Sequence, residues 1–519
     1  MELQKQEYRI LRQKSSAESQ ITMDEEFNVP DARPDVGRMI QKKGSVQIRK
    51  VNVSDDRVML SGELQFCLLY VADDENRGIS SLEGQLPIEE TMRLDGVRDG
   101  DKIRLNWDVE DLAIRLIHPR KLNIQAMVSF VADVQEQKTL LLPVGAEGAD
   151  SMSFYMKEKN ILGICVHRKD TLRLREEIVL PANKQDVEKI LWQDIQVRGL
   201  KLRCGEGEIL YKGEMFVFLL YAGEDPSSPP EWIEEIVPVS GSLDCEKCET
   251  DMLPNIEVRM AQSQITVKPD ANGEERMLTA EAVMDVDLRL EKEQHFSILM
   301  DAYDPTRECT PVSREEAAEY LMIKNEAKCR IGDRQSTGEA QGKILQVCHS
   351  DGSVRVDECR IVPGGLEVEG ILQVRILYIV SDDNMPFYAM EAVMPFLQRI
   401  EVPGMHEQVR YELHTDLEQL STTMADSHEI EIKATINCSA LVLGRQTLEL
   451  LQDIRIKPLD PAKIRDLPGI VCCRIQPGDT LWELAKKYYT TVEDIRTLNG
   501  LETDPKVGQT VVLVKKVES

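Results

Sequence analysis

The chain has 519 residues, 42% of them hydrophobic, and a formal net charge of −28, so its length predicts three or four domains with substantial cores. The acidic balance argues against nucleic acid or an anionic membrane as a partner, because contact with phosphates requires basic patches. The first eight residues contain no apolar stretch typical of a secretory signal, no apolar run approaches the ~20 residues of a membrane helix, and the scattered cysteines then indicate a reducing cytosol.

Most of the chain consists of one motif that occurs three times. A glycine is followed by a tyrosine eight residues later, and that tyrosine by a proline seventeen residues later, with a period of 151 and then 157 residues. We therefore expect three units of one fold, at residues 1–148, 152–305 and 314–458, with the tyrosines at equivalent points and the prolines on one equivalent loop. The repeated residues are Gly62, Gly213 and Gly370; Tyr70, Tyr221 and Tyr378; Pro87, Pro238 and Pro395.

The local pattern within the repeats is typical of β-strands. Residues 45–53, 368–376 and 429–436 alternate apolar and polar side chains, and turn residues at 54–56 and 362–365 separate such runs. The repeated glycines lie inside strand patterns, which predicts a bulge or a close backbone approach. Short helices are expected at 187–192 and 314–323, and an inserted loop at 226–230. The predicted fold class is mainly β: three tandem antiparallel β-sandwich-like repeats followed by a small βααβ domain.

No catalytic motif stands out in these repeats. The seven histidines form no pair with metal-ligand spacing on one element, and the sequence has no G-x-S-x-G, Walker or H-E-x-x-H motif. Cys245-x-x-Cys248 lacks the second ligand pair of a zinc site and does not begin a helix, so we interpret it as a surface turn. We expect a protein that is not an enzyme and has no cofactor, no catalytic residues and no metal site.

The C-terminal tail, residues 469–516, follows an expected linker at 459–468. Thr480-x-x-Glu483 and Thr490-x-x-Glu493 are capping boxes that predict two helices between two short strands. The spacing of the apolar residues predicts a buried face on each helix, and Asn499-Gly500 is a stop signal. The expected inward residues are Leu481, Leu484, Ala485 and Tyr488 in the first helix and Val492, Ile495 and Leu498 in the second.

The pieces QPGDTLW, LNGL and VGQ occur in this order in the tail, which resembles a LysM module, a family known for binding the N-acetylglucosamine backbone of peptidoglycan and chitin. The resemblance implies a shallow groove lined by the loop after the first strand and the loop after the second helix. Cys473 replaces the usual aromatic residue and Pro505 the usual aliphatic one, and the closing strand lacks its usual final proline, so the fold is better supported than the glycan ligand. The implied groove residues are Gly478, Asp479, Thr480, Leu481, Asn499, Gly500, Leu501, Glu502 and Asp504.

Three β-units followed by one LysM module are similar to the SipL family of clostridial spore coat morphogenetic proteins, which combine SPOCS domains with a C-terminal LysM domain. This resemblance implies a scaffold in the mother-cell cytoplasm, at the forespore surface, that helps to assemble or anchor the coat. The implied partners are other coat proteins and, through the LysM domain, the coat ATPase called stage IV sporulation protein A.

A second hypothesis remains open. The protein would then bind the N-acetylglucosamine polymer of peptidoglycan as a wall-associated protein, and an undetected wall-hydrolase activity in the β-units is a further option within this hypothesis. Pull-downs from sporulating cells and from purified peptidoglycan would separate the two hypotheses.

Overall fold

The computed structural model of the chain describes residues 2–74, 77–147, 152–225, 228–337, 342–382, 386–406, 409–460 and 468–516. Before the C-terminal module, the described strands fall into three successive sets of six. The first set is β1 (Glu2–Asn28), β2 (Val36–Ser54), β3 (Arg57–Ala72), β4 (Ile79–Arg93), β5 (Lys102–His118) and β6 (Lys121–Glu147).

The second and third sets repeat this order. The second is β7 (Ser153–Val179), β8 (Lys189–Cys204), β9 (Glu208–Ala222), β10 (Glu231–Asp244), β11 (Leu253–Pro269) and β12 (Glu275–Tyr303). The third is β13 (Arg307–Ser336), β14 (Ile344–Val362), β15 (Gly365–Val380), β16 (Phe387–Glu401), β17 (Val409–Met424) and β18 (Glu429–Pro458). We call the three sets units 1, 2 and 3.

Each unit contains two three-stranded antiparallel sheets. The second, third and fourth strands form one sheet, and the last strand lies between the first and fifth strands in the other. The sheets contact each other through β2 and β5, β8 and β11, or β14 and β17. Each unit encloses its own hydrophobic core, so the predicted class of tandem β-sandwich-like repeats is confirmed.

The three units form a closed ring. β4 of unit 1 contacts β8 of unit 2, β10 of unit 2 contacts β14 of unit 3, and β16 of unit 3 contacts β2 of unit 1. Residues at equivalent positions meet in one shared apolar cluster, which indicates an approximate threefold axis between the units. The equivalent residues in this cluster include Ile40, Leu191 and Cys348, and Leu69, Leu220 and Leu377.

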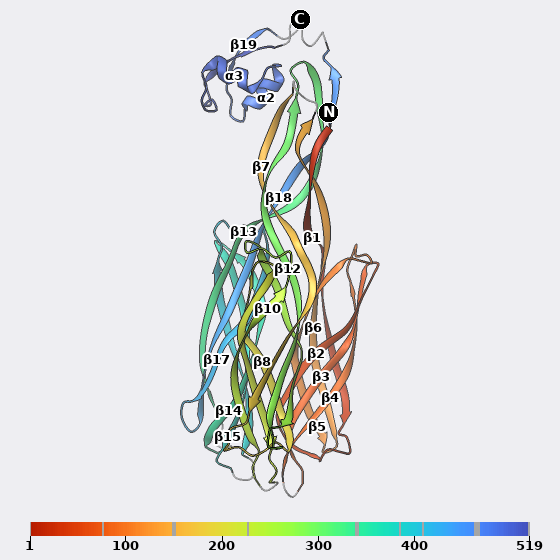
Figure 1. Cartoon of the computed structure of the whole chain (residues 1–519), viewed down its shortest axis with the longest axis vertical. Helices are drawn as coiled ribbons and strands as arrows, with labels where there is room; N and C mark the ends of the chain where they lie inside the picture. The colour runs from red at the N-terminus through yellow and green to blue at the C-terminus, as the bar shows by residue number, and fades with distance from the viewer. Residues whose placement is uncertain are drawn as a thin grey trace.

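The first and last strands of each unit extend well beyond its core. Figure 1 shows β1, β7, β12, β13 and β18 rising together from the three units towards the C-terminal module. Their alternating apolar residues pack into a second shared cluster, and we call this part of the molecule the stalk. The buried residues of the cluster come from all three units: Ile10, Leu140 and Leu142; Ile161, Phe296 and Ile298; Ala318, Leu448 and Leu450.

The repeated tyrosines have the same structural role in each unit, and the repeated glycines mark close backbone approaches that are tighter in units 1 and 3 than at Gly213. A Cβ atom at Gly62 would lie 2.3 Å from the carbonyl oxygen of Gln47, and one at Gly370 would lie 2.2 Å from that of Arg355. The paired strands change register at these points, so the predicted close backbone approach and bulge are confirmed. The three tyrosines are buried on the middle strands β3, β9 and β15, at the equivalent points that the repeat predicts.

The repeated prolines are equivalent, but they do not lie on a loop as expected. Pro87, Pro238 and Pro395 lie inside the edge strands β4, β10 and β16. An edge strand tolerates proline because one side of it needs no N–H donor, and the proline hinders further pairing at that edge.

Both helices predicted in the repeats are wrong. Residues 189–192 begin β8, and residues 314–323 lie inside β13, which pairs with β18 over nearly its whole length. The second segment is rich in Ala, Glu, Leu and Met, which favour helices, and strand pairing with burial overrides that preference. The expected loop at 226–230 is described only in part, since residues 226–227 lie outside the described residues. In the part of the chain that the structure describes, no helix is long and apolar enough to cross a membrane.

Candidate functional site

The C-terminal module has the predicted βααβ order. β19 (Ile470–Arg474) pairs antiparallel with β20 (Thr510–Val514), and α2 (Leu481–Lys487) and α3 (Val492–Asn499) lie between them in the sequence. The hydroxyl of Thr480 accepts a hydrogen bond from the N–H of Glu483, which confirms the predicted start of the first helix. Gly500 adopts the left-handed conformation (φ 62°) and ends the second helix, as predicted.

Two details of the second helix differ from the prediction. Its N-cap is Thr491 instead of Thr490, because Thr490 is buried and its N–H bonds to the carbonyl of Ala485. Leu498 was expected to point inward but is 53% exposed. The neighbouring Asn499 faces the sheet instead, since its amide exchanges two hydrogen bonds of 2.7 Å with the backbone of Val512.

The structure divides the nine predicted groove residues into exposed and supporting ones. Leu481 is only 6% exposed and belongs to the core of the module, and half-buried Asn499 anchors α3 to β20. These two residues therefore support the loops and are not available for a ligand. Leu501 is half-buried against the same core, and the exposed residues are Gly478, Asp479, Thr480, Gly500, Glu502 and Asp504.

Short-range hydrogen bonds hold both candidate loops. The carboxylate of Asp479 accepts a hydrogen bond from the N–H of Gln476 at 2.8 Å, which closes the turn at Gly478 (φ 94°). In the other loop, Arg496 donates to Asp504 at 2.7 Å. Loops fixed in this way lose little conformational freedom when a partner binds.

The module docks on the tip of the stalk through α2. The indole ring of Trp482 packs against Tyr155 and Tyr303, with ring centroids 5.3 and 4.8 Å away, and its N–H donates to the carboxylate of Asp301 at 2.9 Å. The ammonium group of Lys486 contacts the same carboxylate at 2.8 Å. The hydroxyl of Tyr303 donates to the carbonyl of Thr490 at 2.7 Å.

This docking places the module beside the ends of β7 and β12, at the top of Figure 1. The docking residues lie on α2 and at its end, whereas the candidate loops precede α2 and follow α3, and they stay exposed. Local sequence patterns do not predict this contact, because Trp482 and Asp301 are 181 residues apart in the chain. Most of the expected linker, residues 461–467, lies outside the described residues.

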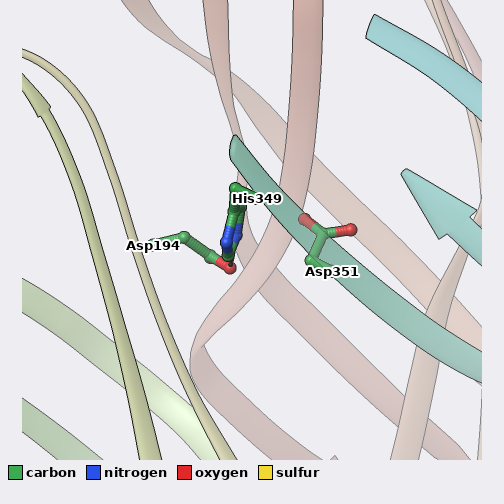
Figure 2. A group of neighbouring side chains, drawn as sticks. All are labelled: Asp194, His349 and Asp351. Atoms are coloured by element: carbon green, nitrogen blue, oxygen red, sulfur yellow. Dashed lines mark hydrogen bonds and ion pairs between the residues drawn. The ribbon is translucent and has the colours of Figure 1, made fainter. Parts of the chain in front are cut away.

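A second candidate site is a buried charged cluster near the ring axis. Lys43, Asp194 and Asp351 occupy equivalent positions of the three units, and His349 lies two residues before Asp351 on β14. The ligand atoms of Asp194, His349 and Asp351 lie within 4.8 Å of one another, an arrangement that could hold a metal ion. Figure 2 shows His349 beside Asp194, with Asp351 further along β14, the strand that carries His349.

The neighbours of this cluster favour an ion-pair network over a metal site. Lys43 is in contact with Asp194, and the guanidinium of Arg375 donates to both carboxylate oxygens of Asp351 at 2.8 Å. Burial alone would lower the pKa of His349, but its hydrogen bonds with Asp194 and Glu234, both at 3.0 Å, raise the pKa to about 9. Each carboxylate thus already has a cationic partner, and a protonated imidazole cannot bind a metal.

A second buried network lies between the other sheets of the three units. Arg104, Asn255 and Glu412 occupy equivalent positions, and both Arg104 and Asn255 donate to the Glu412 carboxylate at 2.7 Å. Arg289 donates to it at 2.7 Å as well, and Arg410 is in contact with it. A cavity of about 1360 Å³ between the units is lined by residues that adjoin both networks. In both networks, residues at equivalent positions of different units have opposite charges. Their ion pairs join unit 1 to unit 2 through Lys43 and Asp194, and unit 1 to unit 3 through Arg104 and Glu412.

The raised pKa of His349 predicts a pH-dependent stability. Protonated His349 stabilises the folded state, so this contribution is complete below pH ~6.5 and is lost as the pH rises through about 9. We expect the free energy of unfolding to fall by on the order of 3 kcal/mol across this window, measured by chemical denaturation at each pH. His349→Gln introduces the residue that unit 1 has at the equivalent position, Gln41. In this variant the free energy of unfolding should change much less with pH across the same window. An equally steep fall in this variant would contradict the assignment.

The fold and its docked module define a tandem-repeat β-protein of the binding type. Family models match the SipL SPOCS domain at residues 35–117, 186–268 and 343–425, and the LysM domain at residues 473–514. The chain belongs to the SipL family of SPOCS-domain proteins, and it is a sporulation-related protein with a peptidoglycan-binding-type module. Each SPOCS match covers the second to fifth strands of a unit and leaves out the long strands of the stalk.

Two further comparisons add little. No curated protein matches the chain. Among solved structures, the ferric yersiniabactin uptake receptor FyuA from Yersinia pestis is 10% identical over 84% of this chain and 80% of that chain. Its TM-score is 0.11, so this likeness carries no argument about fold or function.

Proposed function

We propose that this protein is a non-enzymatic morphogenetic scaffold of the spore coat. In this proposal the LysM domain binds stage IV sporulation protein A, the ATPase that surrounds the forespore, and the protein helps to assemble or anchor the coat from the mother-cell cytoplasm. The SPOCS and LysM matches support this function, because both are binding-type domains.

The observation that carries the proposal is the position of the LysM domain. Its docking contacts use Trp482 and Lys486. The exposed residues of both candidate loops take no part in these contacts and remain accessible to a partner. Two exposed loops held at the end of the stalk suit a scaffold, since this end can bind a partner while the three units remain available for other proteins. We infer that the contact surface consists of Gly478, Asp479, Thr480, Gly500, Leu501, Glu502 and Asp504.

The second candidate function is binding of peptidoglycan. The intact turn at Gly478 and the left-handed Gly500 favour it, because such a groove binds sugars largely through backbone groups. Against it, Cys473 packs half-buried on the core of the module in place of the usual aromatic residue. An aromatic residue contributes more to a small sugar ligand than to a protein partner with a large interface.

A charge reversal in the groove tests the proposal. Glu502→Arg changes an exposed residue of the second loop, and we expect it to weaken binding of the purified ATPase by about tenfold or more, or about 1.4 kcal/mol. The matched control is Glu493→Arg, the same change at an exposed position on α3 outside the loops. Binding would be measured by surface plasmon resonance with the full-length chain.

The outcomes separate the two functions. Weaker binding in the groove variant but not in the control supports the protein partner. Co-sedimentation of the unmodified chain with purified peptidoglycan, together with no binding to the ATPase, would refute the proposal and support the second function.

A further inference from the structure

The C-terminal module has one open sheet edge. β19 and β20 form a two-stranded sheet, and in the described part of the chain β19 pairs with β20 only. The outer edge of β20 is covered by α3, because the amide of Asn499 bonds to the backbone of Val512. The outer edge of β19 has no such cover and can accept a further strand.

The register of the ladder identifies the residues that face this edge. Val512 lies opposite Cys472, but both of its backbone groups bond to Asn499. Bonded and non-bonded pairs alternate along an antiparallel ladder. The N–H and carbonyl groups of Ile470, Cys472 and Arg474 therefore point away from β20.

The side chains of β19 do not protect its edge. Val471 and Cys473 pack on the core of the module, so the side chains of Ile470, Cys472 and Arg474 lie on the open face of the sheet. Ile470 is 66% exposed. The edge strands β4, β10 and β16 of the three units each contain a proline that hinders further pairing, and β19 contains none.

We propose that β19 pairs with β19 of a second copy of this chain, so that two C-terminal modules share one antiparallel four-stranded sheet. Cys472 is the middle residue of β19. A two-fold axis beside it places each residue that faces the edge opposite another that does. Ile470 then lies opposite Arg474 of the second copy, and no like charges are opposed.

The charge and position of the module allow this contact. Residues 470–519 contain seven Lys/Arg and seven Asp/Glu, so the net charge of −28 lies in the rest of the chain. Figure 1 shows β19 at the top of the module, further from the three units than α2. A five-residue edge buries less than the ~1,200 Å² of a standard interface, so we expect weak, concentration-dependent pairing.

The first test measures the mass of the purified, reduced full-length chain by sedimentation equilibrium. We expect the average mass to rise from that of a monomer towards that of a dimer across the micromolar range. A chain that stays monomeric over this range would overturn the proposal, and pairing of β19 with a strand of another protein would give that result.

The second test uses Cys472 as a reporter. Opposed residues that share backbone hydrogen bonds have Cα atoms about 5.5 Å apart, within reach of a disulfide. Cys472 is the exposed one of the twelve cysteines, whereas Cys245 and Cys248, predicted on a surface turn, are 3% and 2% exposed. Mild oxidation with diamide should therefore link two chains through Cys472. A link that Cys472→Ser retains, or that Cys473→Ser loses, would contradict the proposed register.

Two pairs of variants locate the contact. Cys472→Pro removes an N–H that β20 does not use, so the module should fold, as Trp482 fluorescence would verify, but the dimer should be lost. Cys472→Val keeps this N–H and should keep the dimer. Ile470→Lys sets an ammonium group opposite Arg474 of the second copy, twice per dimer, and should weaken pairing about tenfold.

The control for the charge is Val507→Lys, the same change at a residue that is 64% exposed and lies outside β19. It should leave the dimer unchanged. A dimer that persists in Cys472→Pro or is as strong in Ile470→Lys would overturn the proposal, and so would its loss in either control.

Discussion

Replacing Glu412 with glutamine is expected to destabilise the folded protein by about 3–5 kcal/mol, because three buried guanidinium groups lose their common anionic partner. Glu412 is 8% exposed, and Arg104 and Arg289 each donate to its carboxylate at 2.7 Å. Arg289 is itself only 3% exposed, so water cannot replace the lost carboxylate. Chemical denaturation of the full chain would measure the loss.

The same network predicts the response to acid. Burial favours the neutral form of Glu412, but the charges of Arg289, Arg410 and Arg104 hold the pKa of its carboxyl well below the usual range. A depressed pKa stabilises the fold above the pKa of the unfolded chain, near 4.5, and that stabilisation is lost as the pH falls below it. The Glu412→Gln variant should lack this part of the acid sensitivity.

A surface carboxylate provides the control. Glu358 is exposed and pairs with Arg360 at 3.5 Å, so Glu358→Gln should leave the denaturation midpoint almost unchanged. Equal losses in the two variants, or no loss in Glu412→Gln, would show that the Glu412 network does not hold the units together.

Deleting residues 469–519 is expected to disperse a fluorescent fusion of the protein from the forespore surface while the three units stay folded. The reason is that the LysM domain carries the proposed contact with the coat ATPase, and each unit has its own core. Fluorescence microscopy of sporulating cells would measure localisation, and circular dichroism would verify the β-structure of the truncated chain. A truncated fusion that remains on the forespore would contradict this function of the domain.

A point variant separates the groove from the docking contact. Trp482→Ala removes the ring that packs on Tyr155 and Tyr303, and with it the hydrogen bond to Asp301. It leaves the exposed loop residues unchanged, so the fusion should stay at the forespore if the groove alone provides the contact. Loss of localisation in this variant would show that the position of the domain on the stalk is required as well. Leu481→Asp is unsuitable for this purpose, because Leu481 lies in the core of the module.

Local patterns in the sequence predicted much of the fold. Alternating apolar residues, the repeated glycines and the tyrosines indicated three β-units, because strand periodicity and close backbone approach depend on neighbours in sequence or on one paired strand. The capping residue Thr480 and the stop at Gly500 were predicted for the same reason. The start of the second helix was predicted one residue too early. The burial of Leu498 was predicted wrongly, because the neighbouring Asn499 bonds to a strand that follows it by thirteen residues.

The sequence failed where long-range contacts override local preference. The segment at 314–323 has the composition of a helix, but pairing with β18 makes it a strand, and the stalk that contains it was not predicted. The repeated prolines were assigned to a loop, because the sequence does not show which strand lies at the edge of a sheet.

The strand periodicity, the threefold repeat and the LysM resemblance follow from the amino-acid sequence alone, since each depends on residues that are close together or at a fixed spacing. Three features became evident from the three-dimensional structure: the units close into a ring, Lys43, Asp194 and Asp351 meet between the units, and the LysM domain docks through Trp482. These contacts share one cause: their partners lie far apart in the sequence, by 151 residues for Lys43 and Asp194, so burial between packed units selects them and local patterns do not.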